Sequence, residues 1–232
     1  MKKLLLFDVD QTILSTGGGD RKALNIAFEE MYGIRDGFQE IEFAGRMDLS
    51  IVGDAFRKWG VDGADDPEAM YRFRDAYVEV LEEVLKEWSK GREYPGVRDL
   101  LERLAGREDV GLGLATGNFR ESALVKLRRF GLDGFFIEGG FGGDSTNRGE
   151  VVALAIQRCQ AALGTVYPKE NVYVIGDSPR DIQAGRDNGV MTVAVATGYS
   201  TQEQLLQCGP THLFPDLSDT ERFLAQVLGP KA

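Results

Sequence analysis

Two carboxylates stand two residues apart, directly after a short apolar run near the N-terminus. Residues 4–7 are all apolar, Asp8 follows them, and Asp10 comes after a single valine. A run that is continuously apolar, rather than alternating, is typical of a strand buried on both faces of a parallel sheet. Such sheets bind their ligands at the carboxyl ends of the strands, and unpaired buried charge is costly. We therefore expect Asp8 and Asp10 to face a polar ligand; the alternative is a solvated, acidic exit from an ordinary strand.

Polar side chains also follow three further predicted strands, at residues 110–115, 135–138 and 172–175. The candidates at these strand ends are Thr116 with Asn118, Asp144 with Arg148, and Asp177 with Asp181. The carboxyl ends of parallel strands share one edge of a sheet, so these groups can converge although they are distant in sequence. Carboxylates gathered in one crevice raise one another's pKa, which a hard divalent cation offsets. A set of oxygen ligands without histidine or cysteine favours Mg²⁺ over zinc.

The same groups suit a phosphate ligand. The guanidinium of Arg148 and the hydroxyl of Thr116 are donors for phosphoryl oxygens. A carboxylate beside them can attack phosphorus and form an aspartyl-phosphate. Each position also has a purely structural interpretation: helix N-terminal acids for Asp177 and Asp181, a surface charge for Arg148, and a helix cap made by Asn118 with Glu121.

The elements needed to position these groups alternate between helix and strand after residue 97. This alternation predicts an α/β fold, a doubly wound parallel sheet with helices on both faces. Residues 17–91 show no strand signal and predict an all-helical insertion, with helices at 21–32, 49–59 and 67–88. Glycine-rich connectors at 15–20 and 91–96 flank it. We therefore expect an α/β core domain of residues 1–16 and 92–232 and a helical cap domain of residues 17–91.

Composition excludes several classes of function. The 232-residue chain has a net charge of −10 and a pI near 4.8, which disfavours nucleic-acid partners. The N-terminal apolar run is too short for a signal peptide or a membrane span, so a cytoplasmic protein without a membrane partner is expected. Cys159 and Cys208 form no metal-binding motif, and His212, the one histidine, lies far from every cluster. The oligomeric state is left open.

Taken together, three motifs resemble those of the haloacid dehalogenase superfamily. They are Asp8-Val9-Asp10-Gln11-Thr12, Thr116-Gly117-Asn118 and Gly176-Asp177-Ser178-Pro179-Arg180-Asp181. They occur in the order found in that family, between Lys3 and about Gly198, and the helical insertion is similar to its first-position cap. The resemblance implies a Rossmann-like core and is strongest to the phosphoglycolate phosphatase-like branch.

The resemblance also implies residue roles. Asp8 would be the nucleophile, and Asp10 the acid that protonates the leaving oxygen and then deprotonates water. Thr116, with Gly117 and Asn118, would bind the phosphoryl group, and Arg148 would take the place of the basic third motif. Mg²⁺ would be held by Asp8, the Asp10 carbonyl and Asp177, supported by Asp181. Two departures stand out: Gln11 replaces the usual glycine, and arginine at 148 replaces the commoner lysine.

The expected function is that of a Mg²⁺-dependent phosphatase acting on a small phosphorylated metabolite. One alternative is a phosphosugar mutase of the β-phosphoglucomutase type, which would need a bisphosphate primer and release little phosphate. The other is a non-catalytic phosphate-binding domain, which has little reason to keep Asp10. Within the insertion, Arg46 in the loop 43–48 is the residue expected to reach an anionic group of the substrate.

Overall fold

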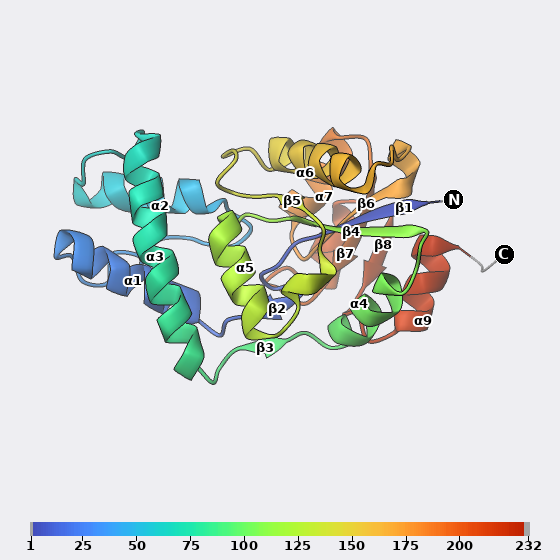
Figure 1. Ribbon diagram of the computed structural model, residues 1–232, viewed down its shortest axis with the longest axis horizontal. Coiled ribbons are helices and arrows are strands. Elements are labelled where there is room, and N and C mark those ends of the chain that lie inside the picture. The colour runs from blue at the N-terminus through green and yellow to red at the C-terminus, as the bar shows by residue number, and fades with distance from the viewer. Residues whose placement is uncertain (1, 230–232) are drawn as a thin grey trace.

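A six-stranded parallel sheet forms the larger part of the protein. The computed structural model describes residues 2–229, and within them the strand order is β5-β4-β1-β6-β7-β8 (Figure 1). The strands span Lys3–Phe7 (β1), Val110–Ala115 (β4), Gly139–Gly140 (β5), Val172–Gly176 (β6), Met191–Val195 (β7) and His212–Phe214 (β8). β1 lies at the centre, paired with β4 on one side and β6 on the other. The predicted strand at the start of the chain and the predicted edge strand at 212–214 are therefore confirmed.

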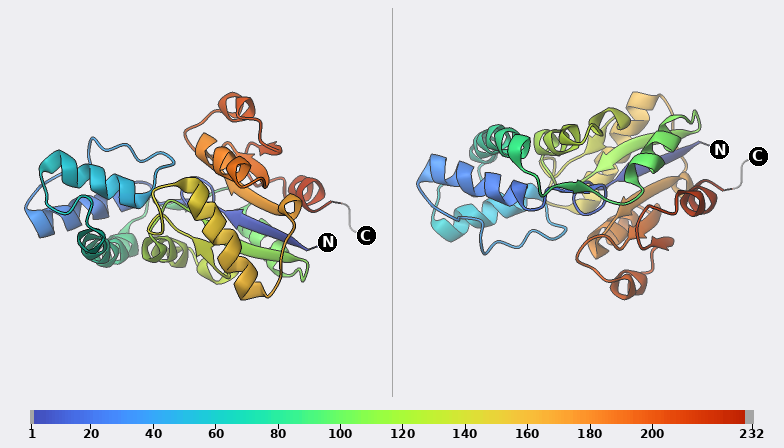
Figure 2. Two further views of the ribbon diagram at one scale, coloured as in Figure 1. Left: turned by 90° about the horizontal axis from the view of Figure 1, so that it is seen from above. Right: turned by 90° about the horizontal axis from the view of Figure 1, so that it is seen from below.

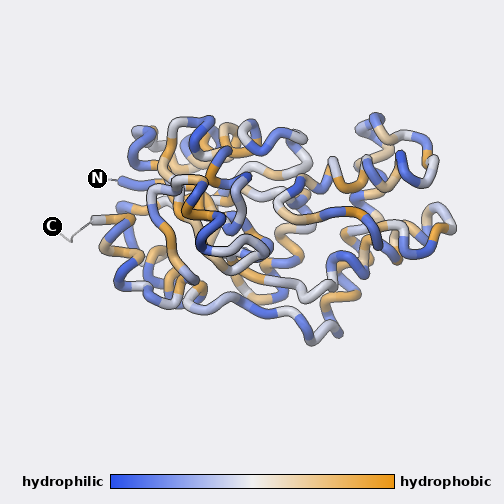
Figure 3. Tube along the Cα trace, turned by 180° about the vertical axis from the view of Figure 1, so that it is seen from behind, coloured by the Kyte–Doolittle hydropathy of each residue, from blue (hydrophilic) through white to orange (hydrophobic). Residues whose placement is uncertain are grey.

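Helices cover both faces of this sheet, as expected for a doubly wound fold. Leu5 and Phe7 of β1 pack in one cluster with α4 (Val97–Ala105), α5 (Arg120–Arg129) and α9 (Thr220–Phe223). Leu4 and Leu6 pack on the opposite face with α6 (Arg148–Leu163) and α7 (Pro179–Asp187). This alternation explains why the run is apolar at every position. In Figure 3 the apolar segments run through the interior of the sheet-bearing part.

The predicted strand at 135–138 is wrong. A short 3₁₀ helix, Asp133–Phe135, ends at the start of this range, and residues 136–138 form no regular element. The strand is β5, Gly139–Gly140, which pairs with Leu114 and Ala115. A β-carbon on Gly140 would lie 2.0 Å from the carbonyl oxygen of Val151, so α6 packs directly on the backbone of this edge strand. A pattern that treats glycine as a strand breaker misses a strand that only glycine can form.

The insertion forms three helices beyond the carboxyl ends of the strands (Figures 1 and 2). They are α1 (Gly19–Tyr32), α2 (Asp48–Trp59) and α3 (Pro67–Glu87). Phe28, Phe38, Phe56 and Phe73 are fully buried at their centre, and the ring centroid of Phe28 lies 5.3–6.0 Å from those of the other three. These helices thus have an apolar core of their own, and the predicted helical insertion is confirmed.

The two connectors to this helical layer are hydrogen-bonded to each other. β2 (Leu14–Ser15) pairs antiparallel with β3 (Arg92–Glu93). A short ribbon therefore joins the helical layer to the sheet, where the sequence alone predicted only two glycine-rich linkers.

The last helices are α8 (Gln202–Gln207) and, after α9, a π-helical turn at Leu224–Leu228. Within residues 2–229, no helix is both long and apolar enough to cross a membrane; the cytoplasmic location stays a prediction.

Asp48 joins the helical layer to the core. Its backbone N–H donates to the carbonyl of Gly117 at 2.7 Å, and its carboxylate accepts from the backbone N–H of Phe119 at 2.8 Å and the hydroxyl of Ser122 at 3.3 Å. Phe119 is the N-cap position of α5, so an acid from α2 caps a helix of the core. The capping pair predicted for this helix, Asn118 with Glu121, is wrong, because the Asn118 side chain is bonded elsewhere.

Replacing Asp48 with alanine should lower the stability of the protein. Loss of a capping carboxylate typically costs about 1–2 kcal/mol, and Asp48→Asn, which keeps an acceptor oxygen, should lose less. Urea unfolding midpoints of the two variants and the wild type measure the effect. An unchanged midpoint in Asp48→Ala would show that the Phe119 bond contributes nothing.

Candidate active site

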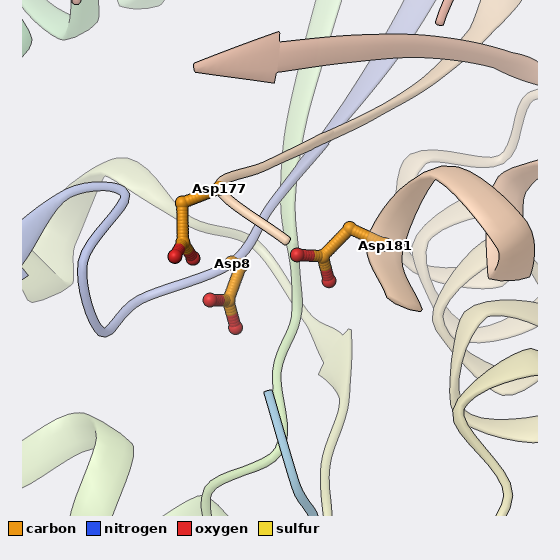
Figure 4. A group of neighbouring side chains, drawn as sticks. All are labelled: Asp8, Asp177 and Asp181. Carbon is orange, nitrogen blue, oxygen red and sulfur yellow. The ribbon is translucent and has the colours of Figure 1, made fainter. Parts of the chain in front are cut away.

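Three acidic side chains meet at the carboxyl edge of the sheet. Asp8 follows β1, Asp177 follows the neighbouring β6, and Asp181 lies in the first turn of α7. One carboxylate oxygen from each lies within 4.8 Å of the other two (Figure 4). The adjacency of β1 and β6 in the sheet, together with the tight turn into α7, brings them together. The convergence predicted from the strand ends is therefore present for these three residues.

Arg148 enters the same cluster from the N-terminus of α6. One guanidinium nitrogen lies 2.9 Å from Asp8 Oδ1 and also contacts Asp181 and the carbonyl of Ala115. Its Nε is the one buried side-chain nitrogen or oxygen that lacks a hydrogen-bond partner within residues 2–229. A buried donor without a partner costs free energy, and an anionic ligand is the group that would satisfy it.

The electrostatics of this cluster fit a divalent cation. Burial is the main cause that raises the pKa of Asp8 to about 6, opposed by Arg148 and reinforced by Asp181. Burial, Asp181 and Asp8 together raise the pKa of Asp177 to about 8. Burial therefore disfavours the ionised form of both carboxylates, that of Asp177 more than that of Asp8, and a further positive charge would stabilise the ionised form. Oxygen donors alone, without histidine or cysteine within the described cluster, match Mg²⁺.

Asp10 points into a second cluster. Its Oδ2 accepts from the Asn118 amide at 2.8 Å and from the Lys126 ammonium at 2.6 Å. Its carboxylate lies outside the group of Asp8, Asp177 and Asp181, and its predicted metal contact, the backbone carbonyl, stays a prediction. Lys126 was not foreseen from the sequence. Its only signal is a place on the buried face of α5, one turn after Ser122.

Thr116 and Gly117 lie between the two clusters. Thr116 is fully buried, its N–H donates to Gly140, and its hydroxyl accepts from the Asn118 amide at 2.8 Å. Gly117 lies so close to the loop 43–48 that a β-carbon there would lie 2.3 Å from the Arg46 carbonyl. The loop 43–48 is therefore seated directly on the phosphoryl-binding residues predicted from the sequence.

Two other candidate residues, Asp144 and Arg46, have partners outside the cluster of Asp8, Asp177 and Asp181. Asp144 pairs with Arg158 at 2.6 Å and accepts from the backbone of Phe141, so it is not part of the carboxylate cluster, and its expected convergence there is wrong. Arg46 lines the same cavity as Asp8, but its guanidinium is bonded to Asp54 at 2.6 Å and to the Glu42 carbonyl at 3.3 Å. Its predicted substrate contact stays a prediction.

A cavity of about 390 Å³ connects these groups between the sheet edge and the helical layer. Asp8, Asp10, Asp177, Asn118, Lys126 and Arg148 line its core side, and Arg21, Phe43, Arg46 and Ile51 line its helical side. This volume suits a small molecule.

Gln11, which also lines this cavity, has a φ of 63° in the left-handed region. Its side chain accepts from Tyr94 and donates to Ser15, which offsets the cost of a non-glycine residue there.

Comparison with known proteins identifies the family. A family model described as haloacid dehalogenase-like hydrolase matches residues 2–189. The chain belongs to this hydrolase family. The pyrophosphatase PpaX of Listeria monocytogenes is 27% identical over 215 residues, which cover 93% of each chain. The phosphoglycolate phosphatase of Synechococcus elongatus is 30% identical over 137 residues, 58% of this chain and 60% of that protein. The superfamily expected from the three motifs is thus confirmed.

Solved structures of this family share the fold. CbbY from Rhodobacter sphaeroides, in complex with phosphate, superposes with a TM-score of 0.72 at 21% identity, covering 94% of this chain and 96% of that one. A putative β-phosphoglucomutase from Thermotoga maritima has a TM-score of 0.64 at 24% identity, covering 98% and 100%. At these identities the likeness establishes the architecture of the haloacid dehalogenase-like hydrolases and nothing finer.

The raised pKa of Asp177 predicts a pH dependence of stability in metal-free protein. Between the ordinary pKa of 3.8 and about 8 the native state binds more protons than the unfolded chain, so the free energy of unfolding falls as pH rises through that window. Asp177→Asn removes this titration. In chelator, the variant should gain stability relative to wild type between pH 5 and pH 8, as measured by urea unfolding. The exposed Asp62→Asn is the control, and parallel curves for Asp177→Asn and wild type would contradict the prediction.

Proposed function

We propose that the protein is a Mg²⁺-dependent phosphatase that hydrolyses a small phosphorylated metabolite through an aspartyl-phosphate. The observation that carries this proposal is the placement of Asp8. It lies 2.9 Å from Arg148, within a cluster of buried carboxylates, at the wall of a cavity of about 390 Å³. The names of the curated relatives, pyrophosphatase and phosphoglycolate phosphatase, support phosphate-ester or phosphoanhydride substrates.

In the first half-reaction the Asp8 carboxylate attacks phosphorus. A bond forms between an Asp8 oxygen and phosphorus while the bond to the leaving oxygen breaks, and Asp10 gives its proton to that oxygen. Arg148 and the hydroxyl of Thr116, together with the Gly117–Asn118 turn, would hold the phosphoryl oxygens. Arg148 also lies within reach of Asp8 itself, so the same guanidinium orients the nucleophile.

In the second half-reaction water attacks the aspartyl-phosphate. Asp10, now a carboxylate, takes a proton from that water, the bond between phosphorus and the Asp8 oxygen breaks, and phosphate leaves. Mg²⁺ would be held by Asp8, Asp177 and the Asp10 carbonyl, with support from Asp181, and would offset the negative charge of carboxylates and phosphate. We propose that residues 17–91 act as a cap domain over a core of residues 1–16 and 92–232, and that this cap excludes bulk water.

A phosphate-release assay tests the proposed function. With Mg²⁺ the wild type should release phosphate from p-nitrophenyl phosphate, and with chelator it should release none. Asp8→Asn should retain its fold by circular dichroism and lose turnover, because the attacking carboxylate is gone. Asp10→Asn should lose about 10²–10⁴-fold. Asp144→Asn is the matched control, since this acid also follows a strand but pairs with Arg158 outside the cluster.

The same assay separates a phosphatase from the phosphosugar mutase alternative and identifies the substrate. Pyrophosphate, phosphoglycolate and hexose phosphates are offered in parallel, each with and without a sugar bisphosphate primer. Phosphate release without primer supports the phosphatase. Isomerisation that needs the primer and releases little phosphate would establish a mutase, and full turnover of any substrate by Asp8→Asn would exclude the covalent mechanism.

Arg46 is expected to determine substrate affinity. Arg46→Ala should raise the KM for the natural substrate while leaving the turnover of p-nitrophenyl phosphate nearly unchanged, because the small ester need not reach the cap loop. Arg57→Ala is a matched control: it pairs with the same Asp54 at 2.8 Å but does not line the cavity. Equal losses on both substrates would place Arg46 in the phosphoryl-transfer machinery or in the fold, and no loss on either would make it a surface charge.

A further inference from the structure

Lys126 is a buried cation that the roles given above do not use. Its side chain is 3% exposed, and its ammonium lies 2.6 Å from Asp10 Oδ2, 2.5 Å from Asn118 Oδ1 and 3.5 Å from Asp20 Oδ2. An ammonium has three donors, and these three acceptors account for all of them. Asp10 and Asn118 belong to the core, whereas Asp20 lies in the first turn of α1 in the helical layer.

The burial of this charge calls for an explanation other than stability. A buried ion pair costs the desolvation of both ions and is often no more stable than an apolar pair of the same volume. An apolar side chain at position 126 would avoid that cost. The arrangement around Asp10 is specific, because Asn118 donates to the same Oδ2 that Lys126 contacts and accepts from Lys126 in turn.

This arrangement leaves the two oxygens of Asp10 in different states. Oδ2 accepts from both Asn118 and Lys126, while no residue within 2–229 donates a hydrogen bond to Oδ1. The carboxylate is therefore anchored through one oxygen, and the other is available for proton exchange with a ligand in the cavity that Asp10 lines. A fixed orientation of this kind is what proton transfer in a catalysed step requires.

We propose that Lys126 is a positioning residue for Asp10. It anchors Oδ2 so that Oδ1 meets the leaving oxygen of the substrate, and through Asp20 it holds the first turn of α1 over the same carboxylate. This inference rests on the proposed function, since it assumes that Asp10 transfers the proton. The geometry of this proton transfer then depends on Lys126 and Asp20 as well as on the Asp8-Val9-Asp10 turn.

The leaving group of the substrate provides the test. Phenyl phosphate and p-nitrophenyl phosphate have nearly the same shape, but p-nitrophenolate is a stable anion that leaves without a proton, and phenolate gains far more from protonation. Lys126→Met keeps the length of the side chain and removes the charge. First-turnover release of phenol should fall about 10- to 100-fold, whereas first-turnover release of p-nitrophenol should change by less than about threefold.

Two further variants control this result. Lys126→Arg restores a cation and should recover a large part of the phenol rate, and Lys22→Met removes an exposed lysine of α1 and should leave both rates unchanged. Circular dichroism and thermal unfolding show whether Lys126→Met folds. If it does not, the ratio of the two rates is measured in the double variant Lys126→Met/Asp20→Asn. In that double variant the carboxylate of Asp20, which would lose its cation in Lys126→Met, is replaced by a neutral amide.

The outcomes separate this inference from the proposed function. A folded Lys126 variant with the wild-type ratio of the two rates, or with equal losses on both esters, would overturn the positioning role. Wild-type protein that releases no phosphate from either ester, or Asp8→Asn that turns over both normally, would instead overturn the proposed function. A selective loss on phenyl phosphate that Lys126→Arg reverses supports the positioning role.

Discussion

The mutual repulsion of buried carboxylates is the constraint around which this structure is built. Asp8, Asp177 and Asp181 place oxygens within 4.8 Å of one another beneath the helical layer. Charges this close in a poorly solvated site cannot all remain ionised without compensation. Arg148 supplies part of it by contacting both Asp8 and Asp181, and the proposed divalent cation would supply the remainder. The strand order, with β6 beside β1, is what makes such close approach unavoidable.

Close packing around these acids explains two glycines. A β-carbon on Gly198 would lie 1.7 Å from Asp177 Oδ2, and one on Gly117 would lie 2.3 Å from the carbonyl of Arg46. Neither glycine has a φ in the left-handed region, so what each provides is space rather than backbone freedom. The first lets the loop after β7 lie against the carboxylate of Asp177. The second lets the loop 43–48 lie against the turn that follows β4.

The sequence predicted the part of the site that follows from strand periodicity. Asp8 and Asp177 follow the strands at 4–7 and 172–176, and Asp181 lies four residues after Asp177 in the first turn of α7. The rule that parallel strands share one edge brings these acids together without knowledge of side-chain contacts. Asp144 satisfied the same rule and still lies apart, because Arg158 on the neighbouring α6 pairs with it. The strand-end rule predicts where the backbone of each acid lies. It does not predict which side chain pairs with that acid, because this depends on how the neighbouring helices pack.

Lys126 and Asp48 could not be predicted for a related reason. Each lies on a helix whose buried face shows no unusual pattern. Each also forms a contact between the core and the helical layer, Lys126 with Asp20 over 106 residues and Asp48 with Phe119 over 71 residues. The strand β5 was missed because its two glycines have no side chains to produce a periodic signal. Local sequence patterns predict individual helices and strands, whereas these contacts form only where the helical layer packs against the core.

The spacing of Asp8 and Asp10 now has a physical explanation. Val9 is fully buried between them, so the two carboxylates leave the end of β1 toward different surroundings. Asp8 joins the arginine and acid cluster of the core, and Asp10 joins Lys126 and Asn118, next to the cap acid Asp20. The two acids therefore have different partners, an arginine for Asp8 and a lysine with an asparagine for Asp10. A spacing of two residues thus gives one strand end two chemically distinct acids at one cavity.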